Sequence, residues 1–153
     1  MASVSSPADT DIPTREDLVL AVAAGADGPY ELDPIRLMKA CFLVSQRGRP
    51  AWRTRFHFEP YSYGPFDRGV YAARDVLLAR GLLAADQPGR YPSYSLTEEG
   101  EQEADRVRSE LGDKDAAWLA RAGSYVTSKS FSQLLDEVYT AFPDFATRSV
   151  VAH

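Results

Sequence analysis

The sequence contains few of the residues that build metal centres, disulfides and membrane spans. It has one cysteine and two histidines among 153 residues, too few and too far apart for a structural zinc site. The single cysteine, Cys41, excludes an internal disulfide and fits a reducing compartment. No apolar stretch approaches the roughly 18 residues of a membrane helix, and the N-terminus does not resemble a signal peptide. We therefore expect a cytoplasmic protein without cofactor, metal or membrane partner.

Catalytic motifs are equally scarce. The sequence has no glycine-rich phosphate loop, no Gly-x-Ser-x-Gly turn and no spaced pair of carboxylates. We predict from this that the protein is not an enzyme. An enzymatic role would require a pocket around Tyr61 and Tyr63, two tyrosines next to a proline turn.

The composition is that of an ordinary globular chain. Hydrophobic residues make up 44% and charged residues 25%, so we expect one domain with its own core over residues 14–153. Residues 1–13 are rich in Ser, Pro, Asp and Thr without periodicity, and we predict that they form a disordered tail.

Charge is distributed unevenly along the chain, whose net charge is −5. Residues 1–33 carry seven acids and one base, and residues 92–153 carry eleven acids and six bases. Residues 34–91 carry ten bases against four acids. Such a basic middle is what a surface for nucleic-acid phosphates needs, although the overall acidity argues weakly against nucleic acid.

Capping and turn residues divide the chain into short elements. Asp33-Pro34, Thr97 and Ser130 are typical helix starts, because a side-chain oxygen there accepts from a free backbone N–H. Alternating aromatic and polar residues from Arg55 to Glu59 favour a half-buried strand, which Pro60 interrupts. We expect helices over residues 14–25, 34–46, 67–80, 97–111, 113–126 and 130–142, further strands over 82–85 and 91–96, and irregular chain over 144–153.

This order of elements is that of a winged helix-turn-helix, in which the third helix enters the major groove and a hairpin wing touches the backbone. We therefore predict an α+β, mostly α fold with extra C-terminal helices over residues 113–143. On this interpretation residues 67–80 form the recognition helix and residues 82–96 the wing.

Four stretches resemble known families: Leu37-Met-Lys-Ala-Cys-Phe-Leu43, Phe58-Glu-Pro-Tyr-Ser-Tyr-Gly-Pro-Phe-Asp67, Arg80-Gly-Leu-Leu83 and Tyr94-Ser-Leu-Thr-Glu-Glu-Gly100. They resemble the YwgA-type bacterial proteins and, more distantly, the Panacea (SocA-like) antitoxin domain, where a Tyr-Gly-Pro element follows a lysine-containing core helix. The last stretch is also similar to PadR-like and MarR-like regulators. The resemblance covers about residues 33–151. It implies a winged-helix domain that acts in transcription control or as an antitoxin or defence-system partner, and it brings no catalytic residues.

Arginines and the hairpin tip provide the candidate DNA contacts. Guanidinium groups suit phosphate oxygens, and outward arginines on the recognition helix could reach guanine edges. The alternatives are a solvated arginine loop, and pairing of the helix arginines with Asp67 and Asp75. The predicted DNA-binding residues are Arg47, Arg49, Arg53, Arg55, Arg68, Arg74, Arg90, Tyr91 and Ser93.

Two groups of apolar residues have alternative roles. Tyr61 and Tyr63 could line a ligand or partner surface, whereas core packing is the simpler interpretation of the neighbouring aromatics. The last helix is more apolar than an end helix requires, so it either completes the core or forms a homodimer seam. The candidate dimer residues are Phe131, Leu135, Val138, Tyr139 and Phe142.

The sequence thus supports two functional hypotheses. The first is a transcriptional regulator, a winged-helix homodimer that binds double-stranded DNA. The second is a winged-helix protein-interaction module, antitoxin-like or a defence-system subunit, which the acids on the recognition helix favour. One continuous basic face joining the arginines would favour the first hypothesis, and a face interrupted by Asp67 and Asp75 would favour the second.

Overall fold

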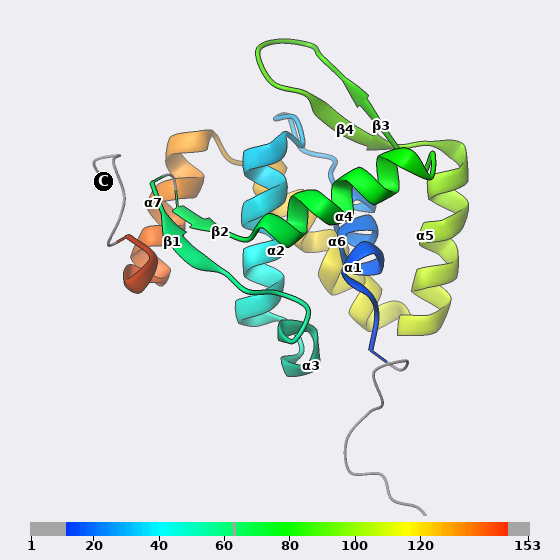
Figure 1. The fold of residues 1–153 in the computed structure, drawn as a ribbon, viewed down its shortest axis with the longest axis horizontal. Coiled ribbons are helices and arrows are strands. Elements are labelled where there is room, and N and C mark those ends of the chain that lie inside the picture. The colour runs from blue at the N-terminus through cyan, green and yellow to red at the C-terminus, as the bar shows by residue number, and fades with distance from the viewer. Residues whose placement is uncertain (1–11, 63, 147–153) are drawn as a thin grey trace, which may run out of the picture.

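The computed structural model describes residues 12–62 and 64–146. Within these ranges the chain forms helices and two antiparallel hairpins, which confirms the predicted α+β, mostly helical class (Figure 1). The elements are α1 (Arg15–Ala24), α2 (Pro34–Arg47), α3 (Pro50–Arg53), β1 (Glu59–Tyr61), β2 (Gly64–Phe66), α4 (Arg68–Ala79), β3 (Leu83–Asp86), β4 (Ser93–Leu96), α5 (Glu98–Leu111), α6 (Asp113–Thr127), α7 (Phe131–Ala141) and a closing 3-10 turn, η2 (Pro143–Ala146).

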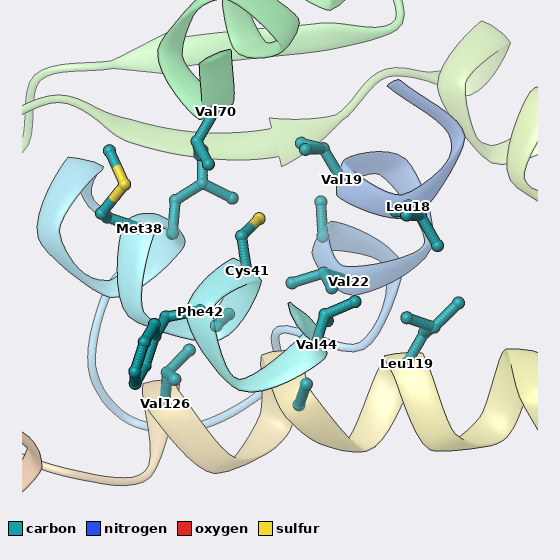
Figure 2. Close-up of a cluster of buried hydrophobic side chains, with 14 of the residues drawn as sticks. Leu18, Val19, Val22, Met38, Cys41, Phe42, Val44, Val70, Leu119 and Val126 are labelled. Carbon is teal, nitrogen blue, oxygen red and sulfur yellow. The ribbon is translucent and has the colours of Figure 1, made fainter. Parts of the chain in front are cut away.

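The core lies between α1, α2 and α6, with α4 covering one side (Figure 2). Helix α2 is at the centre, and Phe42 and Val44 on it are fully buried. Leu18 of α1 and Val126 of α6 are equally inaccessible. Burying a side chain of this size stabilises the fold by about 1.5–3 kcal/mol, so these three helices form the foundation on which the other elements rest.

Helix α6 is part of this core rather than an addition to it. The backbones of α1 and α6 approach so closely that a Cβ atom on Gly123 would lie 2.0 Å from the carbonyl oxygen of Val22. A Cβ atom on Gly25, just after α1, would lie 1.9 Å from the carbonyl oxygen of Ala120. The predicted C-terminal extension therefore contributes to the same core as the N-terminal helices.

The predicted helix starts are confirmed by their caps. The carboxylate of Asp33 accepts from the backbone N–H of Arg36, and Pro34 opens α2. Thr97 caps α5, and Ser130 forms a reciprocal capping box with Gln133 at the start of α7.

The strand predicted from Arg55 to Glu59 is wrong for all but its last residue. Helix α3 ends at Arg53, residues 54–58 form a turn and an irregular segment, and β1 begins only at Glu59. Pro60, which the sequence analysis places at the break of the strand, lies within β1 and faces Pro65 across the β1–β2 hairpin. A proline has no backbone N–H, so it is tolerated in a two-stranded hairpin at a position that does not donate to the partner strand.

The chain ends also differ from the prediction. Residues 1–11 of the predicted tail and residues 147–153 lie outside the described residues. Ile12 and Pro13, also assigned to the tail, accept hydrogen bonds from the side chain of Arg55. Residues 144–146, expected to be irregular, belong to η2, where the ring of Phe145 lies 4.7 Å from that of Phe42.

Candidate functional site

Helix α4 is held firmly at its first turn. The buried carboxylate of Asp67 accepts from the backbone N–H groups of Gly69 (2.8 Å) and His57 (2.7 Å), which caps the helix and fixes the chain before it. The guanidinium group of Arg15 donates to the carbonyl oxygens of Gly69 (3.2 Å) and Arg55 (2.8 Å). Helix α1 and the segment between α3 and β1 therefore position α4.

The outward side of α4 is mostly small and apolar. Val70, Ala73 and Leu77 face the core, and α4 lies in front of α1 and α2 in Figure 1. The opposite side exposes Arg68, Ala72, Asp75, Val76 and Ala79. Val76 is 42% exposed, which is unusual for a large apolar side chain in the described part of the chain.

The four arginines predicted as a phosphate-binding cluster have partners within the chain. Arg49 forms an ion pair with Asp115 of α6 at 2.6 Å. Arg53 donates to the carbonyl oxygens at the end of α2, the nearest at 2.8 Å. Arg55 binds the N-terminal segment through two hydrogen bonds of 3.0 Å, and Arg47 lies 5.0 Å from the ring centre of Phe142. The four side chains thus stabilise different parts of the fold.

On α4 the two predicted arginines differ. Arg74 donates to the hydroxyl of Tyr94 in the β3–β4 hairpin (3.0 Å) and to the carboxylate of its neighbour Asp75 (2.9 Å). Its guanidinium carbon lies 4.4 Å from the ring centre of Tyr71. Arg68 is exposed at the N-terminal end of the helix. Among the predicted contacts on α4, Arg68 is thus the one at the open surface.

The hairpin tip presents the remaining predicted DNA contacts. Arg90 and Tyr91 are exposed, Tyr91 by 51%. The hydroxyl of Ser93 donates to Glu31 at 2.6 Å. In Figure 1 this hairpin lies at the opposite end of the molecule from α3, which carries Arg53. The predicted residues therefore do not gather into one patch.

The predicted dimer residues lie mainly inside the chain. Leu135, Val138 and Tyr139 are at most 2% exposed and pack in the core. Phe131 and Phe142 are half-buried. Three of the five residues predicted as a dimer seam therefore complete the core instead.

A cavity of about 930 Å³ opens beside the first turn of α4. Tyr61 lies at its rim and is 49% exposed; Tyr63, the other predicted ligand-surface residue, lies outside the described residues. The cavity's walls come from α2, the β1–β2 hairpin, α4, the β3–β4 loop and α7. Residues that line it include Asp33, Lys39, Tyr61, Phe66, Arg68, Tyr71, Tyr91 and Phe131.

Lys39 is the unexpected member of this cavity. It stands in the middle of α2 and is 2% exposed. Burial lowers its pKa from 10.5 to about 8, although the nearby charge of Asp33 acts in the opposite direction. Its Nζ atom lies 5.8 Å from the ring centre of Phe131. The signal was present in the sequence as a lysine among the apolar residues of a central helix.

Gly64 explains how the β1–β2 hairpin reaches this lysine. Its φ of 108° lies in the region that favours glycine, and a Cβ atom there would stand 3.2 Å from the Lys39 Nζ atom and 3.3 Å from Leu135. The Gly-Pro pair therefore brings the hairpin backbone directly over the lysine.

Comparisons with protein-family models, with curated proteins and with solved structures find no match. The resemblance to YwgA-type and Panacea proteins thus stays a prediction. In the described residues, no group of His, Cys, Asp and Glu side chains is arranged to hold a metal ion. Over the same ranges, no helix has the length and apolar character needed to cross a membrane.

Proposed function

We propose that the protein is a winged-helix protein-interaction module, with the outward side of α4 as its contact surface. The fold assignment is supported by the packing of α4 against α1 and α2, and by the β3–β4 hairpin that follows it. The backbone N–H of Tyr94 in β4 donates to the carbonyl oxygen of Leu32, so a backbone hydrogen bond joins the segment before α2 to the β3–β4 hairpin. Helices α2 and α4 would be the two helices of the helix-turn-helix, and residues 48–67 join them in place of the usual short turn.

The proposal of a protein partner rests on the small and apolar side chains exposed on α4. Three small or apolar side chains, Ala72, Val76 and Ala79, occupy successive turns of one exposed side. Arg74, which a DNA-binding helix would use, is engaged by Asp75 and Tyr94. A surface with an apolar centre and few free charges suits a partner that presents apolar side chains of its own.

DNA binding is the second candidate, favoured by the exposure of Arg68 at the start of α4 and of Arg90 at the hairpin tip. Each would neutralise about one phosphate, so binding would weaken with salt. Fluorescence anisotropy with duplex DNA tests this directly. Binding at low salt that Arg68→Ala and Arg90→Ala reduce would favour this candidate over the first.

Site-specific photo-crosslinking tests the protein partner. The photoreactive amino acid p-benzoylphenylalanine is placed at Val76 and, as a matched control, at the exposed Gln102 on α5, and the variants are expressed in the native host. We expect a discrete protein adduct from position 76 and none from position 102.

Asp substitutions complete this test. With the photoreactive residue at Ala79, Val76→Asp should abolish the adduct, because it places a charge in the apolar centre, whereas Gln102→Asp should not. Equal adducts at positions 76 and 102, or adducts insensitive to Val76→Asp, would refute the proposal.

A further inference from the structure

The cavity beside α4 has the size and the lining of a small-molecule site. Its volume of about 930 Å³ falls within the ~300–1,000 Å³ of ligand pockets in proteins. It is bounded by segments that are distant in sequence, from α2 to α7. The β1–β2 hairpin forms one wall, because Gly64 allows it to rest on α2 and α7. The space is thus formed by the tertiary fold.

Its charged groups favour a negative ligand. Lys39 and Arg68 line the cavity, one deep and one at the exposed start of α4. The acid in the lining is Asp33, and its carboxylate already accepts from the side chain of Arg36 at 2.7 Å and from the Arg36 backbone N–H at 2.8 Å. Two cationic side chains on the walls of one cavity attract an anion, because opposite charges interact more strongly where water is partly excluded.

Aromatic rings supply the rest of the lining. The ring of Phe66 makes edge-to-face contacts with those of Tyr61 (5.1 Å) and Tyr71 (5.6 Å). Phe131 of α7 also lines the cavity, near the lysine, and so does the half-exposed ring of Tyr91. Rings in these positions can stack against a flat aromatic body.

We propose that this cavity is a binding site for a small aromatic anion, whose negative group lies against Lys39 and Arg68 and whose ring lies among Tyr61, Phe66 and Phe131. The site includes Arg68 in the first turn of α4, whereas the surface that we propose for a protein partner is centred on Ala72, Val76 and Ala79 in the following turns. The test of the cavity below therefore does not depend on the result of the crosslinking test of that surface.

Titration calorimetry with a matched pair of probes tests the site on the full chain. The anion 2-naphthoate should bind at least tenfold more tightly at pH 7 than neutral 2-naphthamide, which has the same ring system. Raising the pH to 9.5 should weaken naphthoate binding by about tenfold, because Lys39, whose pKa in the folded protein is about 8, loses its charge. Adenosine monophosphate, titrated in parallel, distinguishes a nucleotide from an aromatic acid as the source of the anion.

Variants locate the site. Lys39→Met should weaken anion binding at least tenfold and remove its pH dependence, and Arg68→Ala should weaken it about threefold. The exposed Arg108→Ala on α5 is the matched control and should bind as the wild type does. The probe pair and the pH titration use the wild-type chain, so they hold even if a variant fails to fold. Naphthoate and adenosine monophosphate both weaker than 5 mM, equal affinity for the acid and the amide, or unchanged binding by Lys39→Met would overturn the proposal.

Discussion

Replacing Lys39 with methionine should stabilise the domain at neutral pH and remove part of the pH dependence of its stability. Methionine has a similar length and flexibility, so it fills the same space in α2 without a charge. The folded-state pKa of Lys39 is lowered from 10.5 to about 8. Because the side chain is only 2% exposed, solvent screens this effect little.

The sign follows from proton binding. Below pH 8 the lysine is charged in both states, and the folded state bears the full cost of the buried charge. Between pH 8 and 10.5 the unfolded chain binds more protons than the folded one, so stability rises with pH. At ~1.4 kcal/mol per unit of pKa, the lysine costs about 3 kcal/mol at pH 7 and about 1 kcal/mol at pH 9.5. Its contact with Phe131 offsets about 1 kcal/mol of this.

Urea denaturation of the wild type and Lys39→Met, at pH 7 and pH 9.5, measures both effects. We expect the variant to be about 1–2 kcal/mol more stable at pH 7, with the difference falling by about 2 kcal/mol at pH 9.5. The comparison cancels the contribution of Cys41, whose pKa burial raises to about 12 and which lowers stability at high pH in both proteins. A variant less stable than the wild type by the same amount at both pH values would refute the reasoning.

Three further perturbations test the packing. Gly123→Ala places a Cβ atom 2.0 Å from the Val22 carbonyl oxygen and should lower the free energy of unfolding by about 3 kcal/mol, whereas Gly89→Ala, where a Cβ atom has open space, should change it by less than about 0.5 kcal/mol. Arg15→Met removes two hydrogen bonds to backbone carbonyls and should speed hydrogen exchange in the first turn of α4 while leaving α6 protected. Iodoacetamide at pH 8 should not alkylate native Cys41, because burial raises its pKa to about 12; rapid labelling of the folded protein would contradict this.

The helices could be predicted from the sequence because their signals are local. Thr14, Asp33, Thr97 and Ser130 each accept a backbone N–H at a helix start, and such a cap needs nothing beyond the next few residues. The same is true of the β3–β4 hairpin, whose observed strands differ from the prediction by one residue or two at their ends.

The hairpin β1–β2 could not be predicted in the same way. Alternation from Arg55 to Glu59 indicated a strand, but α3 and the packing of Phe56 into the core determine the path of that segment. The pairing of Pro60 with Pro65 depends on Gly64 seating the turn over α2 and α7. That contact joins residues far apart in sequence, and no local pattern encodes it.

The residues of the candidate site could likewise be predicted only in part, because the contacts between distant segments are not encoded locally. The sequence indicated Tyr61 as a ligand-surface residue, and Arg68 and Tyr91 as DNA contacts; all three line the cavity. Lys39 was not, because in sequence it is one charged residue on an apolar helix, and the rings that surround it come from other elements. The arginines around α3 have binding partners in α2, α6 and the N-terminal segment, which composition alone does not reveal.

The position of α6 in the core also determines when the protein acquires its shape during synthesis. Leu119 and Val126 complete the core that α1 and α2 begin, and the close approach at Gly123 fixes the two helices together. A nascent chain that has emerged only as far as α5 holds α4 and both hairpins, yet the faces of α1 and α2 are still open to water. Folding of this domain must therefore wait until α6 has left the ribosome, and a partner or ligand meets only the finished domain.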